Sequence, residues 1–285
     1  MNIGTHTVEI THPDKELFTD ITKKELVEYY QKISQIMLPH VKKRPISMQR
    51  FPDGIKKKGF YQKEVPEYFP SWITTYTIKT GTGKQEQVAI NNAATLIYLA
   101  NQACITPHTW LCSQPRLTKP DRLLFDLDPS KEFTQVKKVA RLIKDICEDA
   151  GLTPHLLLTG GKGVHIVMPL KAEHSFDKVR SWAKKRAEEI VHSDPDHCTL
   201  EQRKDKRQGK IFIDYLRNAY GQTSVPPYAV RAHDKAPIAT PINWSELSTI
   251  HTSQQYTLKT IFKRISRKGD IWSDITTQAS TLPKQ

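Results

Sequence analysis

Two carboxylates stand one residue apart in RLLFDLDPS (residues 122–130), a segment that otherwise predicts a buried strand. Because side chains alternate between the faces of a strand, Asp126 and Asp128 share one face and lie about 6.6 Å apart along the backbone. Two like charges so placed resist burial, and Mg²⁺ or Mn²⁺ relieves that cost because hard cations prefer carboxylate oxygens. The pair predicts a metal site. The alternative is an exposed strand end, with Asp128 capping a helix that begins near Pro129.

A third acid, Asp214, lies within the apolar, β-branched run KIFIDYLRN (residues 210–218). A lone carboxylate buried in such a strand would be costly. Three aspartates on two neighbouring strands could instead hold two metal ions for in-line nucleotidyl transfer. In that chemistry one ion lowers the pKa of an attacking hydroxyl, and the other neutralises the leaving pyrophosphate.

A glycine-rich turn separates two expected strands in LLLTGGKGVHIVMPL (residues 156–170). Glycines let the main chain approach an anion closely, and successive amides can form an anion-binding nest. Thr159 adds a hydroxyl, Lys162 a cation and His165 an imidazole, a combination that would suit a triphosphate. The residue order is not that of a Walker A loop, and a strand rather than a helix follows. The alternative is a glycine-rich hairpin that binds no ligand.

Two arginines and a histidine complete the candidate residues. Arg217 follows Asp214 by three residues, and Arg231 lies in a segment that predicts a second basic strand. The arginine fork suits phosphate oxygens, whereas the ordinary alternative is a surface arginine paired with an acid. His108, in ITPHTWLC, precedes the aspartate strand closely and could contact a ribose hydroxyl or the metal edge. An isolated histidine can equally be structural.

Hydrophobic periodicity predicts the elements that position these residues. Thr22 is the expected cap of a first helix, which Pro39 should end. The alternation of strands and helices predicts an α/β fold, with central sheets carrying the acids and helices outside. One domain over residues 1–285 is expected, with flexible ends at 1–10 and 275–285. The expected helices are 22–38, 91–104, 131–152 and 175–192, and the expected strands are 72–79, 123–128, 155–159, 164–170 and 211–216.

Charge is the strongest signal in the composition. The chain has 43 lysines and arginines against 30 acids, a net charge of +13. This balance favours a polyanionic partner, nucleic acid first, over a merely basic surface. The sequence contains no stretch of about 18 apolar residues and no basic, lipid-facing helix, so a membrane partner is not predicted. The first residues lack the apolar core of a signal peptide, so a cytoplasmic protein with four reduced cysteines is expected.

Several segments, in order, resemble the polymerase domain of bacterial ATP-dependent DNA ligase D, which belongs to the archaeo-eukaryotic primase superfamily and works in non-homologous end joining. The likeness runs from about Thr11 to Leu247 and implies a primase-like core of mixed and antiparallel β-sheets flanked by helices. The segments are residues 12–63, PHTWLCS, DRLLFDLDPS, TGGKGVHIVMPL and KIFIDYLRNAYGQTSVPPYAVRA.

The resemblance implies a role for each candidate residue at the nucleotide. The metal-binding catalytic residues would be Asp126, Asp128 and Asp214. A contact near the sugar and the metal site is implied for His108. The contacts to the phosphates of the incoming nucleotide would be Thr159, Lys162, His165, Arg217 and Arg231.

The resemblance also implies a DNA-binding surface. Lys15 and Lys23 match lysines that hold the 5′-phosphate of a downstream strand at a break. Phe60 and Tyr61 occupy the aromatic position that packs on the DNA, which is chemically sensible because bases stack on aromatic faces.

The sequence departs from the family pattern at two positions. Thr159 stands where serine is usual, which keeps the hydroxyl, and His233 stands where a second arginine is usual, which weakens one phosphate or template contact. The 285 residues resemble the free-standing form of the domain, and a chain without a ligase or nuclease module is expected. A separate ATP-dependent DNA ligase is then expected to seal the break, with a Ku-like end-binding protein as a further partner.

The implied function is a DNA-repair polymerase that adds nucleotides, with ribonucleotides preferred, to a 3′-hydroxyl at DNA gaps or breaks. Its cofactors would be two divalent ions, Mn²⁺ or Mg²⁺, its substrate an NTP or dNTP, and its place the nucleoid of a bacterial or archaeal cytoplasm. A metal-dependent nuclease also needs clustered carboxylates, but has little use for the glycine turn and two arginines. A noncatalytic DNA-end-binding protein explains the charge but not three intact aspartates.

Overall fold

The computed structural model describes residues 1–129 and 133–284, which form two compact units. The first contains residues 1–110, 223–238 and 257–261, and the second contains 111–222, 239–256 and the part from 262 onward. Ser130 and the expected start of the helix at Lys131 lie outside the described residues, as does Gln285. The alternative that Asp128 caps a helix beginning near Pro129 depends on these undescribed residues, so it stays a prediction. Organisation as a single domain stays a prediction.

The second unit is built on a six-stranded sheet in the order β13-β14-β10-β12-β11-β16. All strand pairs are antiparallel except β13 with β14. The elements are β10 (Arg122–Asp128), α3 (Phe133–Asp149), β11 (His155–Leu158), β12 (Val164–Pro169), α4 (Phe176–Ser193), β13 (Cys198–Thr199), η1 (Lys204–Lys206), β14 (Ile211–Asp214), η2 (Leu216–Asn218), β16 (Thr240–Ile242), η3 (Trp244–Thr249), α5 (Ile261–Lys268, whose first residue belongs to the first unit) and η4 (Ile275–Gln278).

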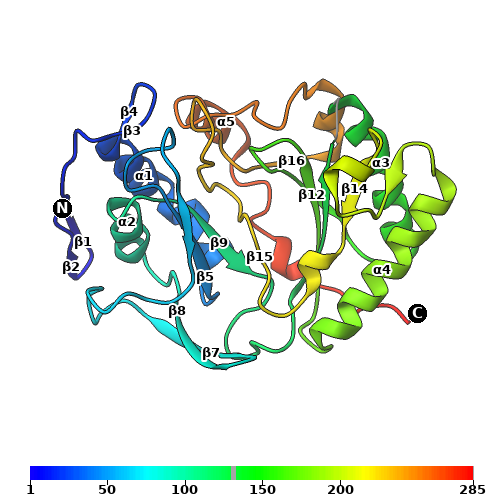
Figure 1. The fold of residues 1–285 in the computed structure, drawn as a ribbon, viewed down its shortest axis with the longest axis horizontal. Coiled ribbons are helices and arrows are strands. Elements are labelled where there is room, and N and C mark those ends of the chain that lie inside the picture. Colours follow the sequence, from blue (N-terminus) through cyan, green and yellow to red (C-terminus); the bar gives the residue numbers. More distant parts are fainter. Residues whose placement is uncertain (130–132, 285) are drawn as a thin grey trace. The chain divides into compact units, whose positions relative to one another are not determined.

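One face of this sheet is apolar and is covered by helices α3 and α4 (Figure 1). Alternate residues of β10, namely Leu123, Phe125 and Leu127, enter the core that these helices close. Because the side-chain period of a strand is two, Asp126 and Asp128 must face the other side. The packing of the helices therefore decides which face of the sheet carries the acids.

The first unit contains a four-stranded sheet in the order β15-β9-β5-β6 and three two-stranded hairpins. Its helices α1 and α2 pack on one another. The elements are β1 (Asn2–Ile3), β2 (His6–Thr7), β3 (Glu16–Phe18), β4 (Ile21–Thr22), α1 (Lys23–Val41), β5 (Ile46–Arg50), β6 (Phe60–Gln62), β7 (Thr75–Thr80), β8 (Gly83–Val88), α2 (Ala93–Asn101), β9 (Cys104–Trp110) and β15 (Thr223–Ser224).

Two buried tyrosines of α1 fasten distant segments of the first unit. The Tyr29 hydroxyl donates to the Tyr228 carbonyl at 2.7 Å, and the Tyr30 hydroxyl donates to the Ile105 carbonyl and accepts from the Val230 amide. Burial raises the pKa of both hydroxyls well above the usual value. Both therefore stay protonated and able to donate, which ties the segment around residue 230 to helix α1.

The α/β class with antiparallel sheets is confirmed, and element ends differ from expectation in a few places. Helix α1 has the expected cap at Thr22 but continues through Pro39, because the Lys42 amide still bonds the Leu38 carbonyl. Helix α2 ends at Asn101 rather than at residue 104. Ala103 adopts a φ of +54°, which a helix does not allow.

Both ends of the chain carry secondary structure where flexibility was expected. Residues 1–10 contain the β1–β2 hairpin, and η4 and a bridge between Leu170 and Ser280 lie near the other end. Mobility of these ends stays a prediction. All four cysteines are buried, and no helix in the described part of the chain is long and apolar enough to cross a membrane.

Candidate active site

The three aspartates lie side by side on adjacent strands of the second unit. Asp126 of β10 pairs with Asp214 of β14 in the antiparallel register, and on its other side it pairs with His165 of β12. Asp128 lies two residues further along β10, opposite Phe212, and so shares the face of Asp126. The structure therefore brings together a row of His165, Asp126 and Asp214 with Asp128 next to it.

Burial and mutual repulsion set the electrostatics of this face. The side chains of Asp126 and Asp214 are only 15% and 12% exposed. Burial, followed by the charge of Asp126, raises the pKa of Asp214, and the same two causes raise the pKa of Asp128. Burial and mutual repulsion thus oppose the charged form of Asp128 and Asp214.

An arginine and a histidine of the second unit already face the acids. The Nε of Arg217 lies 3.3 Å from Oδ2 of Asp214 and 3.9 Å from Oδ2 of Asp126. The Nε2 of His165 lies 3.6 Å from Oδ1 of Asp126. Arg217 and His165 are therefore next to Asp126, and Arg217 is also next to Asp214.

The donor set suits a divalent cation, although no group of three or more His, Cys, Asp or Glu side chains in residues 1–129 and 133–284 is already arranged to hold one. The acids converge on one face and two have a raised pKa, a cost that a hard cation would relieve. Asp126, Asp128 and Asp214 would hold the metal, which would supply charge stabilisation for phosphoryl transfer.

The glycine turn joins β11 to β12, the strand beside β10, and is packed from within. The Thr159 hydroxyl donates to the Gly163 carbonyl at 2.9 Å and accepts from the Gly161 amide at 3.2 Å. The Gly160 amide donates at 3.1 Å to the hydroxyl of Ser253. Two of the amides expected to face an anion are therefore bonded inside the turn, and Lys162 is its one exposed residue.

Gly163 lies against β10, the strand that carries Asp126 and Asp128. A Cβ added there would be 1.7 Å from the Leu127 carbonyl oxygen and 3.3 Å from Cδ of Pro129. No side chain fits in that gap, so the turn contacts β10 at Leu127, the residue between Asp126 and Asp128. The glycine is required for this close approach, and an anion contact of its amide stays a prediction.

Two residues beside the acids were not predicted from the sequence, Asn218 and Arg207. Asn218 is fully buried, and its side chain both accepts from the Leu124 amide and donates to the Leu124 carbonyl, which extends the ladder of β10 beyond the end of β14. Arg207 is 6% exposed, stacks 4.2 Å from the centroid of the Phe212 ring and places Nη1 4.0 Å from Oδ2 of Asp128. Neither belongs to a local pattern that could have revealed it.

The remaining candidates lie in the first unit. His108 of β9 is 9% exposed, and its ring lies 5.5 Å from the ring of Tyr61, centroid to centroid. Cζ of Arg50 lies 5.7 Å from the ring centroid of Phe60, the residue before Tyr61. Adjacent strand residues face opposite sides, so only Tyr61 shares a face with His108. Phe60 and Tyr61 are 46% and 61% exposed and lie on β6, at the edge of the sheet.

Lys15 and Lys23 lie close together at the β3–β4 hairpin, where the Lys23 amide donates to the Lys15 carbonyl. Nζ of Lys15 lies 2.8 Å from Asp53, and Nζ of the buried Lys23 donates to the Thr11 hydroxyl at 3.3 Å. Burial, then the charge of Lys15, lowers the pKa of Lys23. An anion held between the two lysines would relieve this repulsion.

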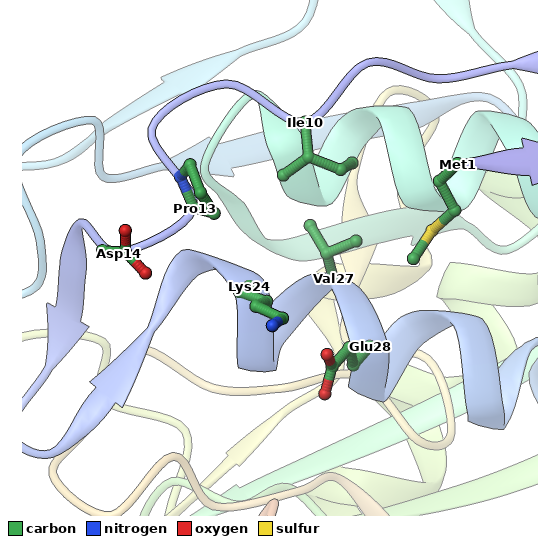
Figure 2. Close-up of a pocket in the computed structure, with 7 residues that line it drawn as sticks. All are labelled: Met1, Ile10, Pro13, Asp14, Lys24, Val27 and Glu28. Atoms are coloured by element: carbon green, nitrogen blue, oxygen red, sulfur yellow. The ribbon is translucent and has the colours of Figure 1, made fainter.

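Two hollows flank this hairpin. One of about 400 Å³ is lined by His12, Asp14 and Lys15. The other, of about 250 Å³, is shown in Figure 2 and has Met1, Ile10, Pro13 and Val27 for its apolar wall and Asp14, Lys24 and Glu28 for its polar wall. The first hollow is lined by Lys15, one of the two predicted DNA-binding lysines, and neither hollow is lined by Lys23.

Arg231 also belongs to the first unit, and the prediction that it lies in a strand is wrong. It follows an isolated bridge between Val230 and Ile238. Tyr228, Lys235 and Ala236 have positive φ angles. A strand requires negative φ angles, so the segment turns instead of continuing as a strand. The Arg231 amide is held by the Pro237 carbonyl at 2.8 Å.

The structure thus divides the predicted site residues between the two units. The second unit holds Asp126, Asp128, Thr159, Lys162, His165, Asp214 and Arg217. The first unit holds Lys15, Lys23, Phe60, Tyr61, His108 and Arg231.

Comparison with known proteins supplies the family. Residues 22–272 match the model of the LigD primase-polymerase domain. The multifunctional non-homologous end joining protein LigD of Pseudomonas aeruginosa is 30% identical over 95% of this chain, and that of Mycolicibacterium smegmatis is 29% identical over 97%. The chain spans 33% and 37% of the length of these two relatives.

A solved structure agrees with these sequence matches. The polymerase domain of Mycobacterium tuberculosis Ligase D, in complex with DNA, superposes with a TM-score of 0.89 at 28% identity, covering 96% of this chain and 99% of that one. The predicted family, fold class and enzyme class, a nucleotidyltransferase of primase–polymerase type, are confirmed at the level of the family. The chain belongs to the LigD primase–polymerase domain family.

Proposed function

We propose that this chain adds nucleotides to a 3′-hydroxyl at DNA gaps or breaks in non-homologous end joining, with two Mn²⁺ or Mg²⁺ ions and with ribonucleotides preferred. The observation that carries the proposal is the pairing of Asp126 with Asp214 on adjacent strands, with Asp128 on the same face and a glycine turn packed against the strand between the two β10 acids. A polymerase needs both an acidic metal cradle and a holder for the triphosphate.

The reaction follows from these parts. The 3′ oxygen forms a bond to the α-phosphorus of the nucleotide, and the bond from that phosphorus to the pyrophosphate oxygen breaks. That oxygen keeps the electron pair, and the hydroxyl proton leaves to solvent. Arg217, His165 and Lys162 would bind the triphosphate, and Thr159 would hold the turn. For His108 and Arg231, contacts to the sugar and the phosphates remain what the family resemblance implies.

DNA is the proposed partner. The related Mycobacterium tuberculosis domain is in complex with DNA, and the net charge of +13 here supports a polyanion. Lys15 and Lys23 would hold a downstream 5′-phosphate, and Phe60 and Tyr61 would pack on the bases. A Ku-like protein and an ATP-dependent ligase would complete the repair at the nucleoid.

Extension of a labelled, 5′-phosphorylated gapped duplex tests the proposal. Each of NTPs and dNTPs is supplied with Mg²⁺ or Mn²⁺, and the labelled strand is expected to lengthen. Shortening of the strand would identify a nuclease instead. Binding without any change in length would identify a noncatalytic end-binding protein.

The two lysines give a second test. Replacing Lys15 or Lys23 by glutamine is expected to weaken binding to gapped DNA about tenfold when the downstream strand has a 5′-phosphate, because each removes a charge-assisted hydrogen bond. Fluorescence anisotropy with 5′-phosphate and 5′-hydroxyl duplexes measures the difference. Lys24→Gln, an exposed lysine on the same turn of α1, is the matched control. Equal losses on both duplexes would reduce the lysines to general backbone contacts.

A further inference from the structure

Ser253 lies 90 residues beyond the glycine turn in the sequence, yet its hydroxyl is built into that turn. The hydroxyl donates to the Gly163 carbonyl at 2.6 Å and accepts from the Gly160 amide at 3.1 Å. Ser253 is 1% exposed, and it belongs to the second unit, as does the glycine turn. A hydroxyl has one proton to donate, so these two bonds fix its orientation.

Ser253 and Thr159 form a matched pair inside the turn. Both hydroxyls donate to the Gly163 carbonyl, and each accepts from one glycine amide, Gly160 for Ser253 and Gly161 for Thr159. The turn is thereby closed from both sides around one carbonyl oxygen. The same residue, Gly163, abuts the Leu127 carbonyl on the strand of the acids.

Lys162 stands at the tip of this braced turn. Thr159, Gly160, Gly161 and Gly163 are buried, and Lys162 alone is exposed. Its position relative to the acids is therefore set by the hydrogen bonds beneath it, not by contacts of its own side chain. A lysine side chain is flexible, so the place of its backbone decides what it can reach.

We propose that Ser253 is a positioning residue for the triphosphate. It holds the turn so that Lys162 meets the phosphate tail of the nucleotide, without touching the nucleotide itself. This inference rests on the proposed polymerase function. Preorganisation of the turn matters because an unbraced turn must be ordered when the anion binds, and that ordering weakens binding.

Binding of inorganic tripolyphosphate, which carries the tail without base or sugar, tests the idea on the full chain. Ser253→Ala is expected to raise the Kd for tripolyphosphate in calorimetry about tenfold and the KM for the nucleotide similarly, because one buried hydrogen-bonded bracing group is lost. The kcat at saturating nucleotide and the affinity for DNA should stay near wild type. Ser253→Cys is close in size to serine but forms weaker hydrogen bonds, so its Kd and KM should lie between those of the wild type and of Ser253→Ala.

Ser248→Ala is the matched control, since its hydroxyl is exposed and bonds only the Ser245 carbonyl within η3. Unchanged tripolyphosphate binding by folded Ser253→Ala or Ser253→Cys would overturn the inference, and so would an equal loss of DNA affinity. Failure of the wild-type chain to bind tripolyphosphate or to extend DNA would instead refute the proposed function. The two failures are thus distinguishable.

Discussion

Asp214→Asn is expected to abolish nucleotide addition and, at the same time, to raise the melting temperature at neutral pH. The loss of activity should reach at least about 10²–10³-fold, the effect of removing one preorganised electrostatic group from an active site. Stability should rise because Asp214 is buried beside Asp126, and its charge opposes folding. Asparagine keeps the acceptor for the Leu216 amide, which lies 2.8 Å from Oδ1 of Asp214.

The pH dependence of this gain follows from the direction of the pKa shift. Burial and Asp126 raise the pKa of Asp214 in the folded chain above that of the unfolded chain. The protonated carboxyl therefore stabilises the fold fully below the unfolded pKa, and this contribution is lost as the pH rises through the higher folded pKa. The advantage of asparagine should be largest at neutral pH, should shrink as the pH falls through the folded pKa, and should vanish below the unfolded pKa of about 4.

Thermal melts with and without Mn²⁺ separate the metal role from a general effect of charge. Wild-type chain should gain several degrees on adding Mn²⁺, since a ligand that binds only the folded state stabilises it. Asp214→Asn should gain much less. Asp145→Asn, an exposed acid of α3, should behave as wild type in every assay. If Asp214→Asn still extends DNA, the assignment of this residue to the metal is wrong.

Local periodicity was enough to predict the strand of the acids. In RLLFDLD the apolar residues alternate with Asp126 and Asp128, so a period of two places both acids on one face whatever the rest of the chain does. The capped helix α1 and the helix α3, which ends before Gly151 with its φ of +77°, follow from equally local signals. Such elements are decided within about twenty residues.

Contacts between distant segments could not be predicted in this way. Asn218 bonds the backbone of Leu124 across 94 residues, and Ser253 bonds Gly163 across 90. A single polar residue leaves no periodic signal, and its partner is chosen only when the sheet forms. Nor does the sequence show that Gly163 must lack a side chain because of its contact with Leu127, which lies on another strand.

Strand pairing also decides which way Phe60 and Tyr61 face. The sequence treats Phe60 and Tyr61 as one surface, but the register of β6 with β5 places them on opposite faces. Tyr61 contacts the ring of His108, and Phe60 contacts Arg50. Tyr61 therefore shares a face of the sheet with His108, while Phe60 faces the opposite side.

Gly163→Ala is expected to destabilise the chain and to reduce nucleotide addition together. The new Cβ would lie 1.7 Å from the Leu127 carbonyl oxygen, far inside van der Waals contact, and this neighbour is backbone that cannot rotate away. Forcing a methyl group into packed structure costs about 1–3 kcal/mol. In a chain of this size each 1 kcal/mol lowers the melting temperature by about 2–4 °C.

The loss of activity should exceed what the loss of stability explains. Relief of the clash moves the turn away from β10, and the Gly163 carbonyl then leaves the hydroxyls of Thr159 and Ser253. Lys162 would move relative to Asp126 and Asp128 even in molecules that remain folded. Assays well below the melting temperature should therefore show a raised KM for the nucleotide. Gly81→Ala, in open space on the β7–β8 hairpin, is the matched control. A Gly163→Ala chain with wild-type melting and kinetics would show that the turn does not need its contact with the strand of the acids.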